Sequence, residues 1–185
     1  MNIIEIILNA LKLILSADTL LYEIIFLSLK VSFIALFISS LFAIIVGYTL
    51  ALKNFYLKNF LLILFNSLMG IPPVVVGLIV YFFFANDGPL GVFQLLYTPT
   101  AMVIAQILII FPIVASLSHE IFLQNWQQYK DHIRSLNIPF FGVIKIFTIH
   151  SYFLLITVLL SAFGRAISEV GAVMIVGGNI DHYTR

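Results

Sequence analysis

Residues 124–139 read Gln-Asn-Trp-Gln-Gln-Tyr-Lys-Asp-His-Ile-Arg-Ser-Leu-Asn-Ile-Pro, the longest polar stretch of an otherwise apolar chain. Of the 185 residues, 62% are hydrophobic and 9% are charged, whereas soluble domains have about 25% charged residues. A chain of this composition belongs in a lipid bilayer, where each crossing takes about 20 residues. The polar stretch must therefore meet water, and we interpret it as a contact surface for a partner.

Composition also excludes several classes of function. The net charge of +1 gives no basic surface for nucleic acid, and the absence of cysteine excludes disulfides and thiolate metal sites. His119 and Glu120 begin a His-Glu-x-x-His pattern, but Leu123 stands where the second histidine is required, so no metal site is expected. The chain has no Gly-x-x-x-x-Gly-Lys-Ser/Thr phosphate loop and no recognisable catalytic triad. We therefore expect no catalytic residue and no enzyme activity in this chain.

Four apolar stretches are long enough to cross the bilayer as helices. The expected spans are 24–52, 58–84, 99–119 and 146–164. They predict an all-α, polytopic transmembrane helical bundle, with residues 1–185 forming a single domain. The first span carries small residues suited to close helix contact, which are Ser32, Ser39, Ser40 and Gly47. Lys30, ahead of them, either snorkels to the interface or lies on a solute path.

Residues 1–18 precede the first span and predict an amphipathic helix. Their polar members recur every three or four residues along one helical face: Asn2, Glu5, Asn9, Lys12 and Ser16. A helix of this kind lies in the membrane interface. A helix packed against the outside of the bundle is the alternative.

The second expected span contains Gly70-Ile71-Pro72-Pro73 near its middle. Two adjacent prolines remove two amide donors, and Pro72 disfavours helical geometry at Ile71, so the helix must bend or break here. Broken backbone at membrane depth is tolerated where protein or a water-filled cavity satisfies it. The stretch is therefore either an ordinary proline kink or part of a pathway wall.

Basic residues in short loops predict the orientation in the membrane. Lys53 and Lys58 fall on the same side as Lys130, Arg134 and Lys145, while the turn over residues 85–97 carries no lysine or arginine. Cytosolic loops carry the excess of lysine and arginine. We therefore expect the polar stretch, taken as residues 124–145, to be cytosolic and the N-terminal helix to lie outside.

The polar stretch itself predicts two short helices that meet at an elbow. Residues 127–136 are compatible with a helix, and Asn137 can adopt the left-handed conformation that ends one. Pro139 is suited to be the first residue of the next helix. Exposed Phe140 and Phe141 on such an elbow indicate a protein contact.

The fourth span continues into Gly-Arg-Ala-Ile-Ser-Glu-Val-Gly at residues 164–171. Arg165 and Glu169 are one helical turn apart and can neutralise each other in a helix. At about 1.5 Å per residue, a straight helix places Arg165 roughly 30 Å from Lys145, near the outer interface. The pair is either an interfacial ion pair or a charge that guards the route of an anion. Residues 172–178 are too short to cross again, so we interpret 164–179 as a broken segment.

Two of these stretches resemble one family of membrane proteins. Residues 69–78, Met-Gly-Ile-Pro-Pro-Val-Val-Val-Gly-Leu, with Tyr81 and the Gly-Pro-Leu-Gly that ends at Gly91, resemble the second core span of tungstate-type permeases. Residues 164–179 are similar to the segment after the coupling loop in that family and, less closely, in molybdate and sulfate permeases. The coupling motif Glu-Ala-Ala-x-x-x-Gly is matched at Asp131 alone, because both alanines and the glycine are replaced.

The resemblance implies the fold of a type I ABC importer permease, in the prokaryotic plasma (inner) membrane. It implies two permease copies as a homodimer in the lipid bilayer, two ABC ATPase subunits and an extracytoplasmic oxyanion-binding protein. ATP and magnesium would bind to the ATPase, and this chain would bind no cofactor. Permeases of the family have a further span after the Gly-Gly-Asn segment, so we expect a span beyond residue 185.

The resemblance also assigns two sets of functional residues. The set expected to couple to the ATPase is Asp131, His132, Ile133, Arg134, Leu136, Asn137, Pro139, Phe140 and Phe141. The set expected along the pathway or gate is Gly70, Pro72, Pro73, Gly77, Gly164, Arg165, Ser168, Glu169 and Gly171.

The function we expect is the permease subunit of an ATP-driven importer of an oxyanion, with tungstate preferred and molybdate or sulfate as alternatives. A secondary transporter or channel is a rival, and its only candidate intramembrane charges are Lys30, Arg165 and Glu169. The second rival is a membrane scaffold that transports nothing and binds a cytosolic protein through the polar stretch.

Overall fold

The computed structural model describes residues 19–181, 183 and 184, and within them the chain is helical with no strand. The expectation of an all-α fold is confirmed. The elements in chain order are α2 (Thr19–Leu52), α3 (Lys58–Met69), α4 (Pro73–Phe84), the 3-10 turn η1 (Gly91–Phe93), α5 (Pro99–Ser135), α6 (Phe140–His150), α7 (Tyr152–Ser168) and α8 (Val170–Gly177). The helix expected over residues 1–18 lies outside the described residues.

Within the described chain, α2 and α5 are each long and apolar enough to cross a membrane. Two further crossings arise if each bent pair of helices counts as one span. The pair α3 and α4 is bent by 106° at the Gly70–Pro73 break, and the pair α6 and α7 by 75°. The double proline thus does break the second expected span, as its chemistry predicts.

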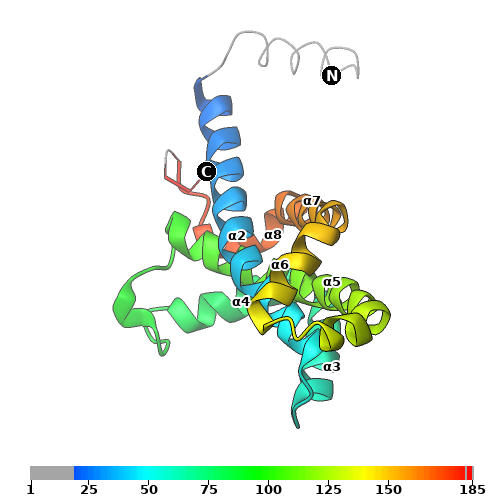
Figure 1. Cartoon of the computed structure of the whole chain (residues 1–185). Helices are drawn as coiled ribbons and strands as arrows, with labels where there is room; N and C mark the ends of the chain where they lie inside the picture. Colours follow the sequence, from blue (N-terminus) through cyan, green and yellow to red (C-terminus); the bar gives the residue numbers. More distant parts are fainter. Residues whose placement is uncertain (1–18, 182, 185) are drawn as a thin grey trace.

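Helices α2 and α5 lie side by side and form the centre of the bundle, with the N-terminal part of α2 extending beyond the other helices (Figure 1). The residues of α2 that face the bundle recur every fourth position and are mostly small: Val31, Ala35, Ser39, Ala43, Gly47 and Ala51. Ser32, Ser39 and Gly47 of the expected small-residue stripe are buried against the bundle. Ser40 is not, because its exposed hydroxyl bonds back to the carbonyl of Phe37.

Helices α2 and α5 approach each other closely at Gly47. A Cβ atom there would lie 2.8 Å from the carbonyl oxygen of Ala115 and 2.9 Å from the backbone nitrogen of His119, both on α5. Only glycine lets the two backbones come this near, as is common where helices pack in a membrane. The hydroxyl of Ser39 and Nε2 of His119 are buried without a described partner.

Helix α5 begins at Pro99, where the expected span 99–119 begins, and runs without interruption to Ser135. The polar residues after Leu117 contain no glycine or proline before Pro139, so the helix continues through the first part of the polar stretch. The first half of the polar stretch is therefore the end of a long helix, and the elbow does not consist of two short helices.

The expected span 146–164 is also corrected. Helix α6 begins at Phe140 and ends at His150, and α7 begins at Tyr152 after a bend at Ser151. Asn125 of α5 donates a buried hydrogen bond of 2.5 Å to the hydroxyl of Ser151, which fixes the bend. The depth of Arg165 counted along a straight helix from Lys145 is therefore wrong.

The Gly47 contact generates a stability prediction. We expect Gly47→Ala to destabilise the protein by about 1–3 kcal/mol through overpacking, a fall in melting temperature of roughly 2–12 °C. The measurement is thermal unfolding of the purified protein in detergent. The matched control is Gly164→Ala, because a Cβ at Gly164 meets nothing within 4 Å. Equal melting temperatures for the two variants would contradict the tight crossing.

Candidate functional site

The elbow after α5 is built by a helix C-cap. Asn137 has a φ of 49°, the left-handed conformation expected from the sequence. The N–H of Ile138 donates to the carbonyl of Ile133 at 3.3 Å, and the N–H of Asn137 donates to that of Arg134 at 3.2 Å. This pair of bonds is a Schellman motif, so the local sequence alone fixes the direction in which the chain leaves α5. Pro139 then caps α6, which begins one residue later than expected.

The inner side of the elbow is anchored to α2. The hydroxyl of Tyr48 donates to the carbonyl oxygen of Phe140 at 3.3 Å, and the Tyr48 ring packs edge-on against Phe122 and Phe140. Tyr48, Phe122, Ile133, Val143 and Phe147 form one buried cluster. The elbow is therefore attached to the membrane helices by a hydrophobic core as well as by the backbone.

The residues expected to contact an ATPase differ in exposure. Asp131, His132, Leu136, Pro139 and Phe141 are exposed, Leu136 at 70% and Phe141 at 81%. Arg134, Asn137 and Phe140 line a hollow on the inner side. Ile133 is 7% exposed and belongs to the buried cluster, so it supports the elbow and offers no contact surface.

The two glycine- and proline-rich stretches singled out in the sequence lie against each other. A Cβ at Gly77 of α4 would be 2.8 Å from the Cα of Ala172 in α8, and one at Gly171 would be 3.1 Å from the side chain of Val74. Gly77 is therefore required for the close packing of α4 on α8, and Gly171 contributes to it because a larger residue would displace the side chain of Val74. Gly70 and Pro72 are exposed at the break itself.

The C-terminal end of α8 is held by the loop that precedes α5. The backbone N–H of Tyr97 donates to the carbonyl of Val176 at 2.9 Å. A hydrogen bond with Tyr81 of α4 raises the pKa of Tyr97. The loop, α4 and α8 consequently form one connected unit.

Helix α7 carries a polar face that the described part of the chain leaves uncovered. Thr157, Ser161, Gly164 and Ser168 are exposed at helical spacing, and the Arg165 side chain beside them is 39% exposed. The three hydroxyls donate to carbonyls of their own helix, which leaves their oxygens able to accept from water. Gly164, Arg165 and Ser168 were expected along the pathway; Thr157 and Ser161 were missed.

Arg165 and Glu169 form the ion pair that their spacing allows. Nε of Arg165 lies 2.8 Å from Oε1 of Glu169, whose side chain is 14% exposed. Helix α7 ends at Ser168, and Glu169 is the break before α8. The acid therefore sits at the N-terminus of α8, where the helix dipole stabilises a negative charge.

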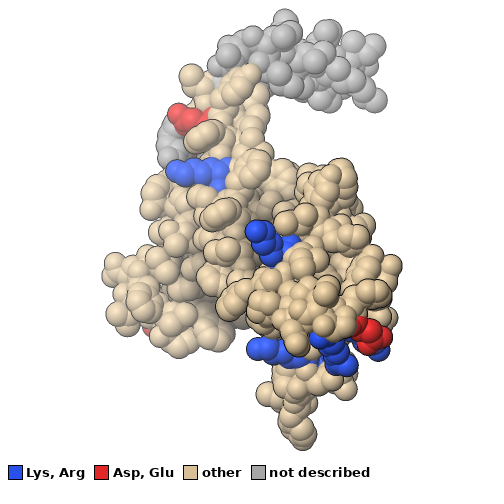
Figure 2. Space-filling model, viewed as in Figure 1, with Lys and Arg blue, Asp and Glu red and all other residues tan. Residues whose placement is uncertain are grey.

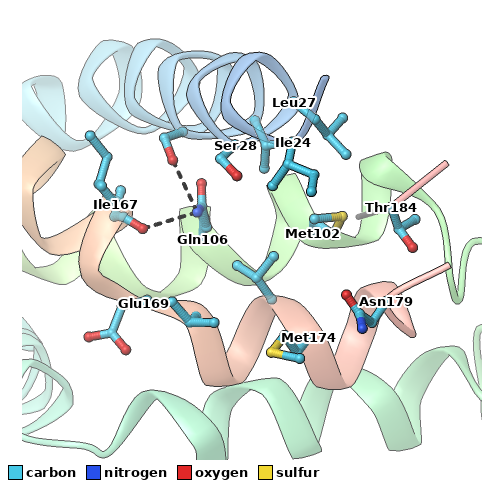
Figure 3. A pocket seen from close by; sticks show the side chains of 15 residues that line it. Ile24, Leu27, Ser28, Met102, Gln106, Ile167, Glu169, Met174, Asn179 and Thr184 are labelled. Atoms are coloured by element: carbon cyan, nitrogen blue, oxygen red, sulfur yellow. Dashed lines mark hydrogen bonds between the residues drawn. The ribbon is translucent and has the colours of Figure 1, made fainter. Parts of the chain in front are cut away.

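A cavity of about 360 Å³ lies between α2, α5 and the α7–α8 break (Figure 3). Gln106 of α5 is 3% exposed at its wall, and its Nε2 donates to the hydroxyl of Ser32 at 3.2 Å and to the carbonyl of Ala166 at 3.1 Å. The side-chain oxygen of Gln106 is buried without a described partner. One amide thus joins three helices beside the break, a role that its position in an apolar span did not reveal.

The described residues hold no group of three or more side chains that could bind a metal ion. The candidate site therefore has three parts. They are the polar face of α7, the two interrupted segments that pack against each other at α4 and α8, and the elbow between α5 and α6.

The chain also matches known proteins in sequence. Residues 39–182 match the family model described as binding-protein-dependent transport system inner membrane component. The chain is 41% identical over 176 residues to the tungstate uptake system permease protein TupB of Peptoclostridium acidaminophilum, which covers 95% of this chain and 77% of that protein.

Two other relatives are 35% identical. A probable anion ABC transporter permease protein of Haloferax volcanii matches over 146 residues, 79% of this chain and 63% of that protein. TupB of Campylobacter jejuni matches over 132 residues, 71% of this chain and 55% of that protein. The match thus spans less than two thirds of the length of these two relatives.

The Asn125–Ser151 bond generates a prediction for a double-mutant cycle. We expect Asn125→Ala and Ser151→Ala each to lower stability, and the double variant to lose less than the sum, with a coupling of about 0.5–2 kcal/mol. Unfolding in detergent measures all four proteins. The control pair is Asn125→Ala with Ser161→Ala, whose hydroxyl bonds within its own helix. Additive losses at 125 and 151 would contradict the bond.

Proposed function

Because the chain belongs to the family of binding-protein-dependent transport system inner membrane components, we propose that it is the permease subunit of an ATP-driven tungstate importer. The observation that carries the proposal is the polar face of α7 with Arg165, next to the packed pair α4 and α8. An arginine on an otherwise apolar surface needs water or a polar partner.

Tungstate is preferred because two of the relatives are named tungstate permeases, one at 41% identity. A sulfate transport permease, CysW of Escherichia coli, is 27% identical over 151 residues. Sulfate and molybdate are therefore the second candidates. All three are tetrahedral dianions, so the polar wall of α7 would suit each of them.

In the proposed assembly, two copies of the chain face each other across the polar faces of α7. The oxyanion would arrive from an extracytoplasmic binding protein and pass between the copies. The wall offers hydroxyls and an arginine that is already paired with Glu169. Binding in the pathway would therefore be weak, which favours release.

The energy would come from the hydrolysis of ATP, which two separate ATPase subunits would bind together with magnesium. These subunits would dock on the exposed residues of the elbow, Asp131 and Phe141 among them. The Schellman cap and the Tyr48 contacts make the elbow rigid. The Asn125–Ser151 bond joins the same helix to the start of α7. A displacement of the elbow would consequently reach α7 and, through the break at Glu169, α8.

The direct test is ATP hydrolysis by the complete complex of permease, ATPase and binding protein in lipid vesicles. We expect binding protein loaded with tungstate to stimulate hydrolysis above the rate with unloaded protein, and to drive tungstate into the vesicles. Molybdate and sulfate are compared at equal saturation. No stimulation by any of the three oxyanions would overturn the proposal, and transport without ATP would favour a secondary transporter or channel.

The docking surface is tested in the same assay with Asp131→Arg. Breaking a charge pair that becomes buried in an interface costs about 2–5 kcal/mol, so we expect transport to fall more than about tenfold. The matched control is Asp87→Arg, an exposed aspartate in the turn after α4. Full transport by the Asp131 variant would favour a scaffold, or docking elsewhere on the chain.

The pathway wall is tested by thiol labelling, since the chain contains no cysteine. We expect Ser161→Cys and Ser168→Cys in the assembled complex to react with a charged, membrane-impermeant thiol reagent. Phe37→Cys on α2 is the control, because Phe37 is 72% exposed on an apolar helix surface and a thiol there would face lipid. Equal labelling at positions 37, 161 and 168 would argue against a water-filled wall on α7.

A further inference from the structure

A second cavity, of about 420 Å³, lies on the inner side of the elbow. Its lining combines an apolar floor with two cations and two aromatic rings: Leu52, Lys53, Trp126, Ile133, Arg134, Asn137, Ile138, Phe140 and Val143. Figure 2 shows lysine and arginine side chains gathered in the lower part of the molecule, beneath α6 in the view of Figure 1, with an acidic side chain at one end of the group.

The two cations of this cavity lack an acidic partner. Nζ of Lys53 lies over the ring of Phe140, 4.8 Å from its centre, and the guanidinium of Arg134 lies 5.9 Å from the centre of the Trp126 ring. Neither forms an ion pair with a described carboxylate. The rings hold both charges at the cavity by cation–π attraction without neutralising them. The cavity is therefore suited to an anion.

The surroundings of Lys53 place the cavity at the level of a membrane interface. Phe55, Tyr56 and Leu57 lie two to four residues after it and are exposed, Tyr56 completely, at 101%. Lys58 comes next at the start of α3. Aromatic side chains interleaved with lysine are typical of the boundary between lipid headgroups and water, and Trp126 within the cavity is of the same kind.

We propose that this cavity binds the phosphate headgroup of an anionic phospholipid from the cytosolic leaflet. Lys53 and Arg134 would contact the phosphate, and the apolar floor with Trp126 would pack against the glycerol and the first acyl carbons. A basic pocket on the cytosolic side of membrane helices suits such a headgroup. The inference goes beyond the transport proposal and does not depend on which oxyanion is carried.

The lipid site and the proposed docking surface lie on different sides of the end of α5. Trp126 and Ile133 are seven residues apart and therefore share a helix face, at about 100° per residue. Asp131 and Ser135, two residues to either side of Ile133, point about 160° away from it. Arg134 lies between the two faces. A bound lipid would therefore support the elbow from behind and leave the exposed face free.

The test is a titration of the full chain, purified in mild detergent, with phosphatidylglycerol, read by native mass spectrometry. We expect phosphatidylglycerol to bind more tightly than phosphatidylcholine of the same chain length. A charge near an anionic lipid surface contributes about 1 kcal/mol, so Lys53→Gln should weaken binding about fivefold. Lys53→Gln with Arg134→Gln should weaken it on the order of 25-fold.

The matched control is Lys58→Gln, because Lys58 lies on the same side but outside the cavity, where it bonds to Asn54. It should bind phosphatidylglycerol like the unchanged protein. If the double variant does not fold, two other measurements test the lipid site. These are the affinity of Lys53→Gln for phosphatidylglycerol and the loss of phosphatidylglycerol binding by the unchanged protein at high salt. Equal binding by the Lys53 and Lys58 variants would overturn the proposal. So would displacement of the lipid by an equal concentration of inorganic phosphate or by added ATPase, since the occupant would then be a free anion or a partner protein.

Discussion

The contact of α2 with α5 at Gly47 is the constraint on which the other helices depend. Helices in a bilayer gain little from the hydrophobic effect against each other, so close backbone approach and van der Waals packing hold them together. Small residues on every fourth position of α2 make that approach possible. Helix α5 in turn carries the elbow at one end and, through Gln106 and Asn125, reaches Ala166 and Ser151.

Buried polar groups are placed where the backbone is interrupted. Asn125 reaches the bend at Ser151, Gln106 reaches the carbonyl of Ala166 beside the break at Glu169, and Tyr48 reaches the carbonyl of Phe140 at the start of α6. An interrupted helix leaves backbone groups without intrahelical partners, which is costly in an apolar environment. Gln106 supplies a donor to a carbonyl near the C-terminal end of α7, whereas Asn125 and Tyr48 tie the bend at Ser151 and the start of α6 to the long helices α5 and α2.

The sequence predicts the features whose cause is local. Adjacent prolines break the second span, Asn137 ends α5, and the spacing of Arg165 and Glu169 makes an ion pair, because each depends on a few neighbouring residues. The bend at Ser151 was missed, since neither glycine nor proline marks it and its partner Asn125 is 26 residues away. Gln106 and the Gly77–Ala172 contact were missed as well, because tertiary packing alone gives them their roles.

The distribution of these contacts also determines where the bundle can move. Helix α7 is fixed at its start by Asn125 and near its end by Gln106, both on α5. Beyond Ala166, the break at Glu169 is bridged by one ion pair that is partly exposed, and such pairs contribute only about 0.2–1 kcal/mol. Helix α8 is instead packed tightly on α4 through Gly77 and Gly171. Val176 of α8 also shares a buried cluster with Val80 of α4 and Ala101 of α5. The weakest connection is therefore the one between α7 and α8, so a displacement of α7 against α8 would concentrate at Glu169, beside the polar face of α7.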